Sequence, residues 1–140
     1  FTAAPQIMLS TVACPRFVGF VEAGVTGGGE LLECAEEYLR PLREEGIDTL
    51  ILGCTHYPLL TGVISYVLGD AVTLVSSAEE CAKDVYAALT RQGLAHDRSR
   101  TASHRFWTTG HPEAFAGIGQ RLMGGGLIEV VEQFATTPRM

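Results

Sequence analysis

The sequence predicts an α/β fold, with a parallel sheet flanked by helices in three layers. Strand-like and helix-like patterns alternate along the chain, which is the order that a parallel sheet requires. Residues 47–52 form a near-continuous apolar run, typical of a parallel strand that is covered on both faces. Hydrophobic residues make up 46% of the 140 residues and charged residues 19%, so a packed core is expected and disorder is not.

The first expected elements are a strand and a helix. Gln6–Val12 is apolar and partly β-branched, which predicts a strand. Pro15 suits the first turn of a helix, because the N–H that proline lacks is not needed there. The apolar side of this helix is expected to consist of Phe17, Val18, Phe20 and Val21.

A second helix is predicted from Glu30 to Glu45. Its apolar residues recur at helical spacing, Pro41 is expected to bend it, and Gly46 is expected to end it. Cys34 lies beside the apolar stripe and is interpreted as a buried structural thiol. The glycines at 27–29 match neither GxGxxG nor the P-loop pattern, so we interpret them as a flexible turn rather than a phosphate loop.

The middle of the chain repeats the alternation of strand and helix. After the strand Ile47–Leu52, the pattern predicts a helix at Pro58–Leu68, a strand at Val72–Val75 and a helix at Ala78–Arg91. Cys81 lies beside the apolar residues of this last helix and is interpreted in the same way, as an inert buried thiol.

The last part of the chain begins with a change in composition. The polar residues His96–His104 predict a linker. A short strand at Arg105–Thr109 and a helix at Pro112–Leu122 are expected to follow.

Charge and cysteine usage exclude several classes of protein. The net charge is −6 and the ten Lys and Arg residues are scattered, so the chain lacks the basic stripe that binds nucleic acid. No apolar run reaches the length of a membrane span. The four cysteines form no CxxC pair and no secreted disulfide scaffold, which indicates reduced thiols in a cytoplasmic protein.

The stretch Leu50–Leu60, LILGCTHYPLL, carries the chemistry of the chain. Cys54 follows the apolar strand, at the edge of the sheet where α/β proteins bind ligands. The helix predicted from Pro58 has a partly positive N-terminus, which would lower the pKa of the thiol, and backbone N–H groups there could receive a carboxylate with the hydroxyl of Thr55. His56 is a candidate general acid or base.

These residues by themselves leave several interpretations open. A Cys/His pair also fits nucleophilic hydrolysis or acyl transfer, which would need a third residue to orient the imidazole. A zinc site is a weaker alternative, because no second close pair of ligands exists. The plainest alternative is a structural cysteine with a solvent-facing histidine.

Four segments in order resemble the glutamate racemases of the aspartate/glutamate racemase superfamily: VACPRFVGFVEAG, DTLILGCTHYPLL, VTLVSSAEE and FWTTGHPEAF. The resemblance extends from near the start of the chain to about Leu122 and is to the C-terminal portion of the family. It implies an isomerase that needs neither pyridoxal phosphate nor a metal, and that binds L- and D-glutamate as small-molecule substrates. Two cysteines on opposite faces of the α-carbon exchange its proton, which supplies D-glutamate for peptidoglycan in the bacterial cell wall.

The resemblance also implies roles for individual residues. Cys54 matches one of the two proton-transfer cysteines, and Thr55 matches a substrate-binding position. His56 matches a residue that binds substrate and assists the cysteine. Glu22 in FVEAG matches an acidic residue with a supporting catalytic role, whereas Cys14 in VACP is typical of the family without being catalytic.

The other catalytic cysteine of the family, which lies beside Asn and Thr, has no counterpart in this sequence. Residues 1–77 are accordingly expected to form most of the second domain, without its first strand, and residues 78–140 to form the segment returning to the first domain. The 140 residues alone are expected to be inactive, and the full-length protein to be a homodimer. The alternatives are a racemase of aspartate or another amino acid, and a non-catalytic remnant or binding module.

Overall fold

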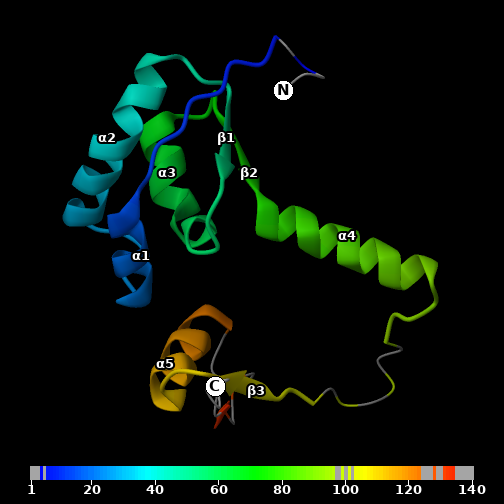
Figure 1. Ribbon diagram of the computed structural model, residues 1–140. Helices are drawn as coiled ribbons and strands as arrows, with labels where there is room; N and C mark the ends of the chain where they lie inside the picture. The colour runs from blue at the N-terminus through cyan, green and yellow to red at the C-terminus, as the bar shows by residue number, and fades with distance from the viewer. Residues whose placement is uncertain are drawn as a thin grey trace, which may run out of the picture. The chain divides into compact units, whose positions relative to one another are not determined.

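A computed structural model of the chain describes residues 4, 6–96, 99, 101, 103–123, 128 and 131–134. The chain divides into two compact units, Phe1–Ala95 and His96–Met140. Figure 1 shows the elements of both units in chain order. Each unit is described by itself.

The first unit alternates helices and strands. Its elements are α1 (Pro15–Glu22), α2 (Gly29–Glu44), β1 (Thr49–Leu52), the short 3-10 helix η1 (Tyr57–Leu60), α3 (Thr61–Leu68), β2 (Thr73–Ser76) and α4 (Ser77–Arg91). Strands β1 and β2 pair in parallel, with Leu50 opposite Leu74 and Leu52 opposite Ser76. The predicted α/β class, with parallel strands and flanking helices, is therefore confirmed.

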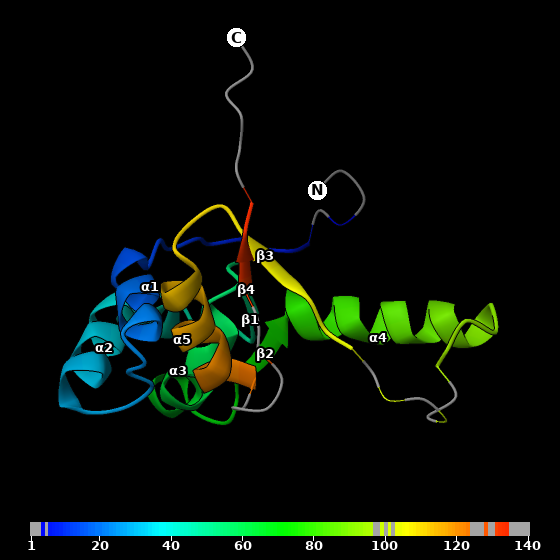
Figure 2. The ribbon, with the colours of Figure 1, turned by 90° about the horizontal axis from the view of Figure 1, so that it is seen from below.

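The core of this unit lies between one face of the sheet and the first three helices. Figures 1 and 2 show α1, α2 and α3 gathered on one side of the strands, with α4 running away from them. Since side chains alternate along a strand, Leu50 and Leu52 face this core while Ile51 faces away. Ile51 is 64% exposed, so the expected cover on both faces is wrong at this position in the described chain.

Helices α1 and α2 follow their sequence patterns closely. In α1 the buried residues are Phe17 and Val21, with Pro15 in the first turn as predicted. Helix α2 starts after Gly28, whose φ of 105° needs a glycine, and its buried residues are Leu31, Cys34, Ala35, Leu39 and Leu42. Cys34 is therefore a buried thiol, as predicted.

Three expectations for the first unit are wrong. Residues 6–12 do not form a strand: Met8 is 95% exposed, and β1 hydrogen-bonds only to β2 among the described residues, so this run has no strand partner there. Cys81 is exposed rather than buried, because no residue of α4 is buried in the described chain. The turn after Cys54 leads into η1, and the α-helix starts only at Thr61, later than predicted.

The second unit is a smaller α/β element. It contains β3 (Phe106–Thr108), α5 (Pro112–Met123) and β4 (Val131–Gln133), with β3 and β4 in parallel. The first two agree with the predicted strand and helix, whereas β4 has no counterpart in the prediction. The domain boundary expected after Ser77 concerns the two domains of the family and stays a prediction.

Candidate functional site

The turn at the carboxyl end of β1 holds the predicted site residues. Leu52 is buried and anchors the strand, and Gly53 leads from it into the turn. Cys54 and His56 are half-buried, whereas Thr55 is exposed. Pairing with β2 and burial of Leu52 therefore fix the base of the turn, while its polar side chains remain accessible.

His56 links the other predicted residues. Its Nδ1 atom lies 3.9 Å from the Cys54 sulfur and 3.3 Å from the Thr55 hydroxyl. Its Nε2 atom lies 3.5 Å from a carboxylate oxygen of Glu22, the last residue of α1. The structure thus brings Cys54, His56 and Glu22 together in that order, although Glu22 lies 32 positions before Cys54 in the sequence.

This order suits proton transfer. The negative charge of the Glu22 carboxylate attracts a proton at Nε2, so this contact favours the imidazole tautomer that carries its proton there. Nδ1 then carries a lone pair facing the Cys54 thiol, from which it can take a proton and to which it can return one. The contact with Glu22 also gives the imidazole an orienting partner, which the sequence alone does not identify.

Tyr57, which directly follows His56, connects this part of the chain to the start of α1. The Tyr57 hydroxyl accepts a hydrogen bond from the Cys14 N–H at 3.3 Å and donates one to the Cys14 carbonyl at 3.2 Å. Its ring packs edge-on against Phe17, with centroids 5.6 Å apart. The sequence suggests the Tyr57 backbone N–H as a possible donor to a carboxylate, whereas the role of its side chain is visible only in the structure.

Cys14 itself is a structural thiol. It is 3% exposed, and burial, followed by the nearby Cys34 thiol, raises the pKa of Cys14 to about 11. It therefore stays protonated near neutral pH. The non-catalytic role expected for Cys14 stays a prediction.

The chain is similar to proteins named glutamate racemase. That of Acidothermus cellulolyticus is 58% identical over 125 residues, which cover 89% of this chain and 48% of that protein. That of Parafrankia sp. is 55% identical over 140 residues, covering 99% of this chain and 51% of that protein. No protein-family model matches the chain.

Solved structures agree with these relatives. The crystal structure of glutamate racemase from Francisella tularensis in complex with D-glutamate superposes with a TM-score of 0.80 at 28% identity, covering 96% of this chain and 50% of that one. The chain belongs to the glutamate racemase family. It spans about half the length of the relatives it matches and corresponds to a C-terminal portion of them.

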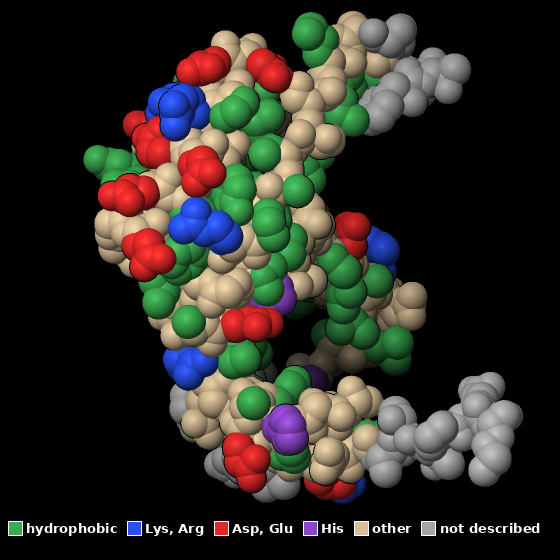
Figure 3. Space-filling model, turned by 60° about the vertical axis from the view of Figure 1, so that its left-hand side comes forward, with side chains coloured by type: hydrophobic (Ala, Val, Ile, Leu, Met, Phe, Trp, Pro, Cys, Tyr) green, Lys and Arg blue, Asp and Glu red, His purple; other side chains and the backbone are tan. Residues whose placement is uncertain are grey.

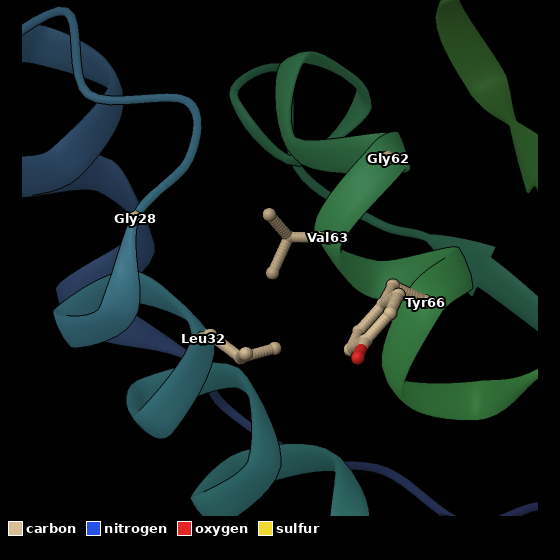
Figure 4. Close-up of a pocket in the computed structure, with 5 residues that line it drawn as sticks. All are labelled: Gly28, Leu32, Gly62, Val63 and Tyr66. Atoms are coloured by element: carbon tan, nitrogen blue, oxygen red, sulfur yellow. The ribbon is translucent and has the colours of Figure 1, made fainter.

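Family membership makes the turn at Cys54, rather than the apolar groove of the first unit, the candidate active site. That groove has a volume of about 410 Å³ and is lined by Gly28, Leu32, Gly62, Val63 and Tyr66. Figure 4 shows Leu32 and Val63 pointing toward each other from α2 and α3. None of its lining residues belongs to the turn of residues 54–57.

The sequence predicts an α-helix N-terminus close to Cys54. The helix directly after Cys54 is instead η1, a single 3-10 turn, so no α-helix begins beside the thiol.

The remaining expectations concern binding to metals, membranes and nucleic acids. No group of three or more metal-ligating side chains occurs among the residues that the structure describes. None of the described helices is long and apolar enough to cross a membrane. On the face shown in Figure 3, the Lys and Arg side chains stand apart from one another.

Proposed function

We propose that the complete gene product containing this chain interconverts L- and D-glutamate, with Cys54 as one of two proton-transfer residues. The observation that carries this proposal is the contact series Cys54–His56–Glu22 in a chain of the glutamate racemase family. A thiol next to an imidazole can alternate between thiol and thiolate, which racemisation needs in its two directions. A related glutamate racemase binds D-glutamate in its crystal structure, which favours glutamate as the substrate.

Each residue of the site has a distinct role in this reaction. The Cys54 thiolate removes the α-proton in one direction, and the thiol returns a proton in the other. His56 exchanges the proton with the thiol and binds substrate, and Glu22 orients His56. The exposed hydroxyl of Thr55 binds the substrate carboxylate, because donors placed there stabilise the carbanion-like transition state.

Racemisation also requires a second acid–base group on the opposite face of the α-carbon. Cys14 and Cys34 are buried, and burial raises both pKa values. Cys81 lies on the exposed helix α4 rather than in the turn at Cys54. We therefore assign the second base to a part of the family sequence that this chain does not match, and expect the 140 residues alone to be inactive.

The biological setting extends the same proposal. D-glutamate formed in this way would supply the peptidoglycan of the bacterial cell wall, and the reaction would take place in the cytoplasm. The four thiols are free in the structure, as a reducing compartment requires. The complete protein is expected to be a homodimer, which analytical ultracentrifugation tests directly.

The experiment is to express the complete gene product and follow the circular dichroism of L-glutamate and, separately, L-aspartate. Turnover of glutamate is expected, and Cys54→Ala should lower kcat by roughly a thousandfold or more, within the range expected for loss of an acid–base group. Turnover of aspartate alone would move the assignment to the alternative substrate. Binding of D-glutamate without any turnover by the wild-type protein would favour a non-catalytic binding module instead.

A further inference from the structure

We propose that Tyr57 is a positioning residue, which holds helix α1 against the turn at Cys54 so that Glu22 reaches His56. The inference rests on the proposed racemase function and extends it to Tyr57, to which that proposal gives no role. Tyr57 directly follows His56 in the chain, while Glu22 is the last residue of α1. A connection between the turn and α1 is therefore needed to keep the two side chains 3.5 Å apart.

The two hydrogen bonds of Tyr57 supply that connection. Both join the phenol to the backbone of one residue, Cys14, at 3.3 Å from its N–H and 3.2 Å to its carbonyl. Cys14 is the N-cap residue of α1, and its carbonyl also accepts the first helical hydrogen bond, from the Phe17 N–H at 3.1 Å. The phenol thus binds the point where the chain enters the helix.

The surroundings of Tyr57 keep its phenol protonated and its ring in one position. Burial is the largest cause that raises the pKa of Tyr57, so the phenol stays protonated and remains a donor at neutral pH. The edge-on packing of its ring on Phe17, which is 1% exposed, fixes the ring from the side of α1.

A fixed start of α1 determines where its end lies. The helix has eight residues and is therefore about 12 Å long at 1.5 Å per residue. Phe17 and Val21 are buried in the core, so the helix behaves as one packed body. A small rotation of α1 about Cys14 would move the Glu22 carboxylate away from Nε2 of His56. The two atoms are already 3.5 Å apart, so a further increase would break their direct contact.

A second tyrosine offers a matched control. The Tyr38 hydroxyl accepts a hydrogen bond from the Arg16 N–H at 3.4 Å, and its ring also packs edge-on against Phe17, with centroids 5.4 Å apart. Tyr38 therefore contacts the same end of α1, also through a phenol that bonds to the backbone and a ring that packs on Phe17. It belongs to α2, however, and is not attached to the turn that carries His56.

The test compares Tyr57→Phe, Tyr38→Phe and Glu22→Gln in the complete gene product. Tyr57→Phe removes both hydrogen bonds but keeps the ring, and should lower kcat about tenfold with a smaller change in KM, whereas Tyr38→Phe should change kcat less than twofold. If Tyr57 acts through Glu22, the double variant Tyr57→Phe/Glu22→Gln should be no slower than Glu22→Gln alone. Tyr57→4-aminophenylalanine restores a donor and should recover most of the rate.

A second measurement keeps the proposal testable without turnover. The ¹⁵N chemical shifts of the His56 ring report its tautomer, and Tyr57→Phe should move them in the same direction as Glu22→Gln, while Tyr38→Phe should leave them in place. Equal effects of the two tyrosine variants, or a full additional tenfold loss in the Glu22→Gln background, would overturn the proposal. An inactive wild-type protein in which Tyr57→Phe still moves the His56 shifts would contradict the racemase function and leave the positioning role standing.

Discussion

The structure predicts a large difference in reactivity between the thiols of the chain. Burial raises the pKa of Cys14 from its ordinary value of 9.0 to about 11. At pH 8 a thiol with the ordinary pKa is about one-tenth ionised, whereas a pKa near 11 leaves about one-thousandth as thiolate. Because the thiolate is the species that reacts, Cys14 should be alkylated at least about a hundredfold more slowly than such a thiol.

The assay is alkylation of the folded 140-residue chain by iodoacetamide, quantified by peptide mass mapping. Cys81, which is exposed, and Cys54, which is half-buried in its turn, should react first. Cys34 should react slowly together with Cys14, since burial is also the main cause that raises its pKa. In urea all four thiols should react at similar rates. Alkylation of Cys14 at the rate of Cys81 in the folded chain would refute the assignment of Cys14 to the core.

Further predictions concern stability and its dependence on pH. Leu31→Ala should lower the free energy of unfolding by about 2–5 kcal/mol in urea titrations, because Leu31 is fully buried, whereas Leu89→Ala on the exposed helix α4 should change it by less than about 0.5 kcal/mol. Ser76→Ala removes the side chain that accepts the Glu79 N–H at the start of α4, and should cost about 0.5–2 kcal/mol, which Ser76→Asp should largely restore. The folded state holds the Cys14 proton more tightly than the unfolded state, so the contribution of Cys14 to stability is complete below pH 9 and is lost as pH rises through about 11. The Cys14→Ala variant should lack this loss in urea titrations at pH 8 and pH 11.

Local patterns in the sequence predicted the helices well. The start of α1 follows from Pro15, and the stripe of apolar residues in α2 identifies the face that is buried. These features depend on residues within a few positions of one another, which is the range over which helical periodicity operates.

Features that depend on distant partners were not predictable. Residues 6–12 have the composition of a strand, but a strand needs the backbone of a neighbour, and in the described sheet β1 and β2 pair only with each other. The same reason explains Cys81, whose helix has an apolar side but buries none of it in the described chain. Burial is a property of the surface that an element meets, and a periodic pattern does not specify that surface.

In the candidate site, too, the sequence identifies individual residues but not the contacts between distant ones. Cys54, Thr55 and His56 are consecutive, so a local motif identified them, and Glu22 was identified from the family resemblance. The contact between Glu22 and His56 joins α1 to the turn after β1, and only the structure shows it. The double hydrogen bond from Tyr57 to Cys14 joins the same two elements, again across a separation that local spacing does not encode.

Cys14 and Cys54 begin from similar sequences, since each lies just before a helix that starts near a proline. Cys14 is immediately followed by Pro15, so it becomes the N-cap of α1, and its thiol is buried with a pKa of about 11. Cys54 is separated from Pro58 by three residues, of which the first two continue the bend that begins at Cys54 and place His56 beside the thiol. Cys54 is therefore accessible where Cys14 is buried, and Tyr57, the first residue of η1, hydrogen-bonds to the backbone of Cys14.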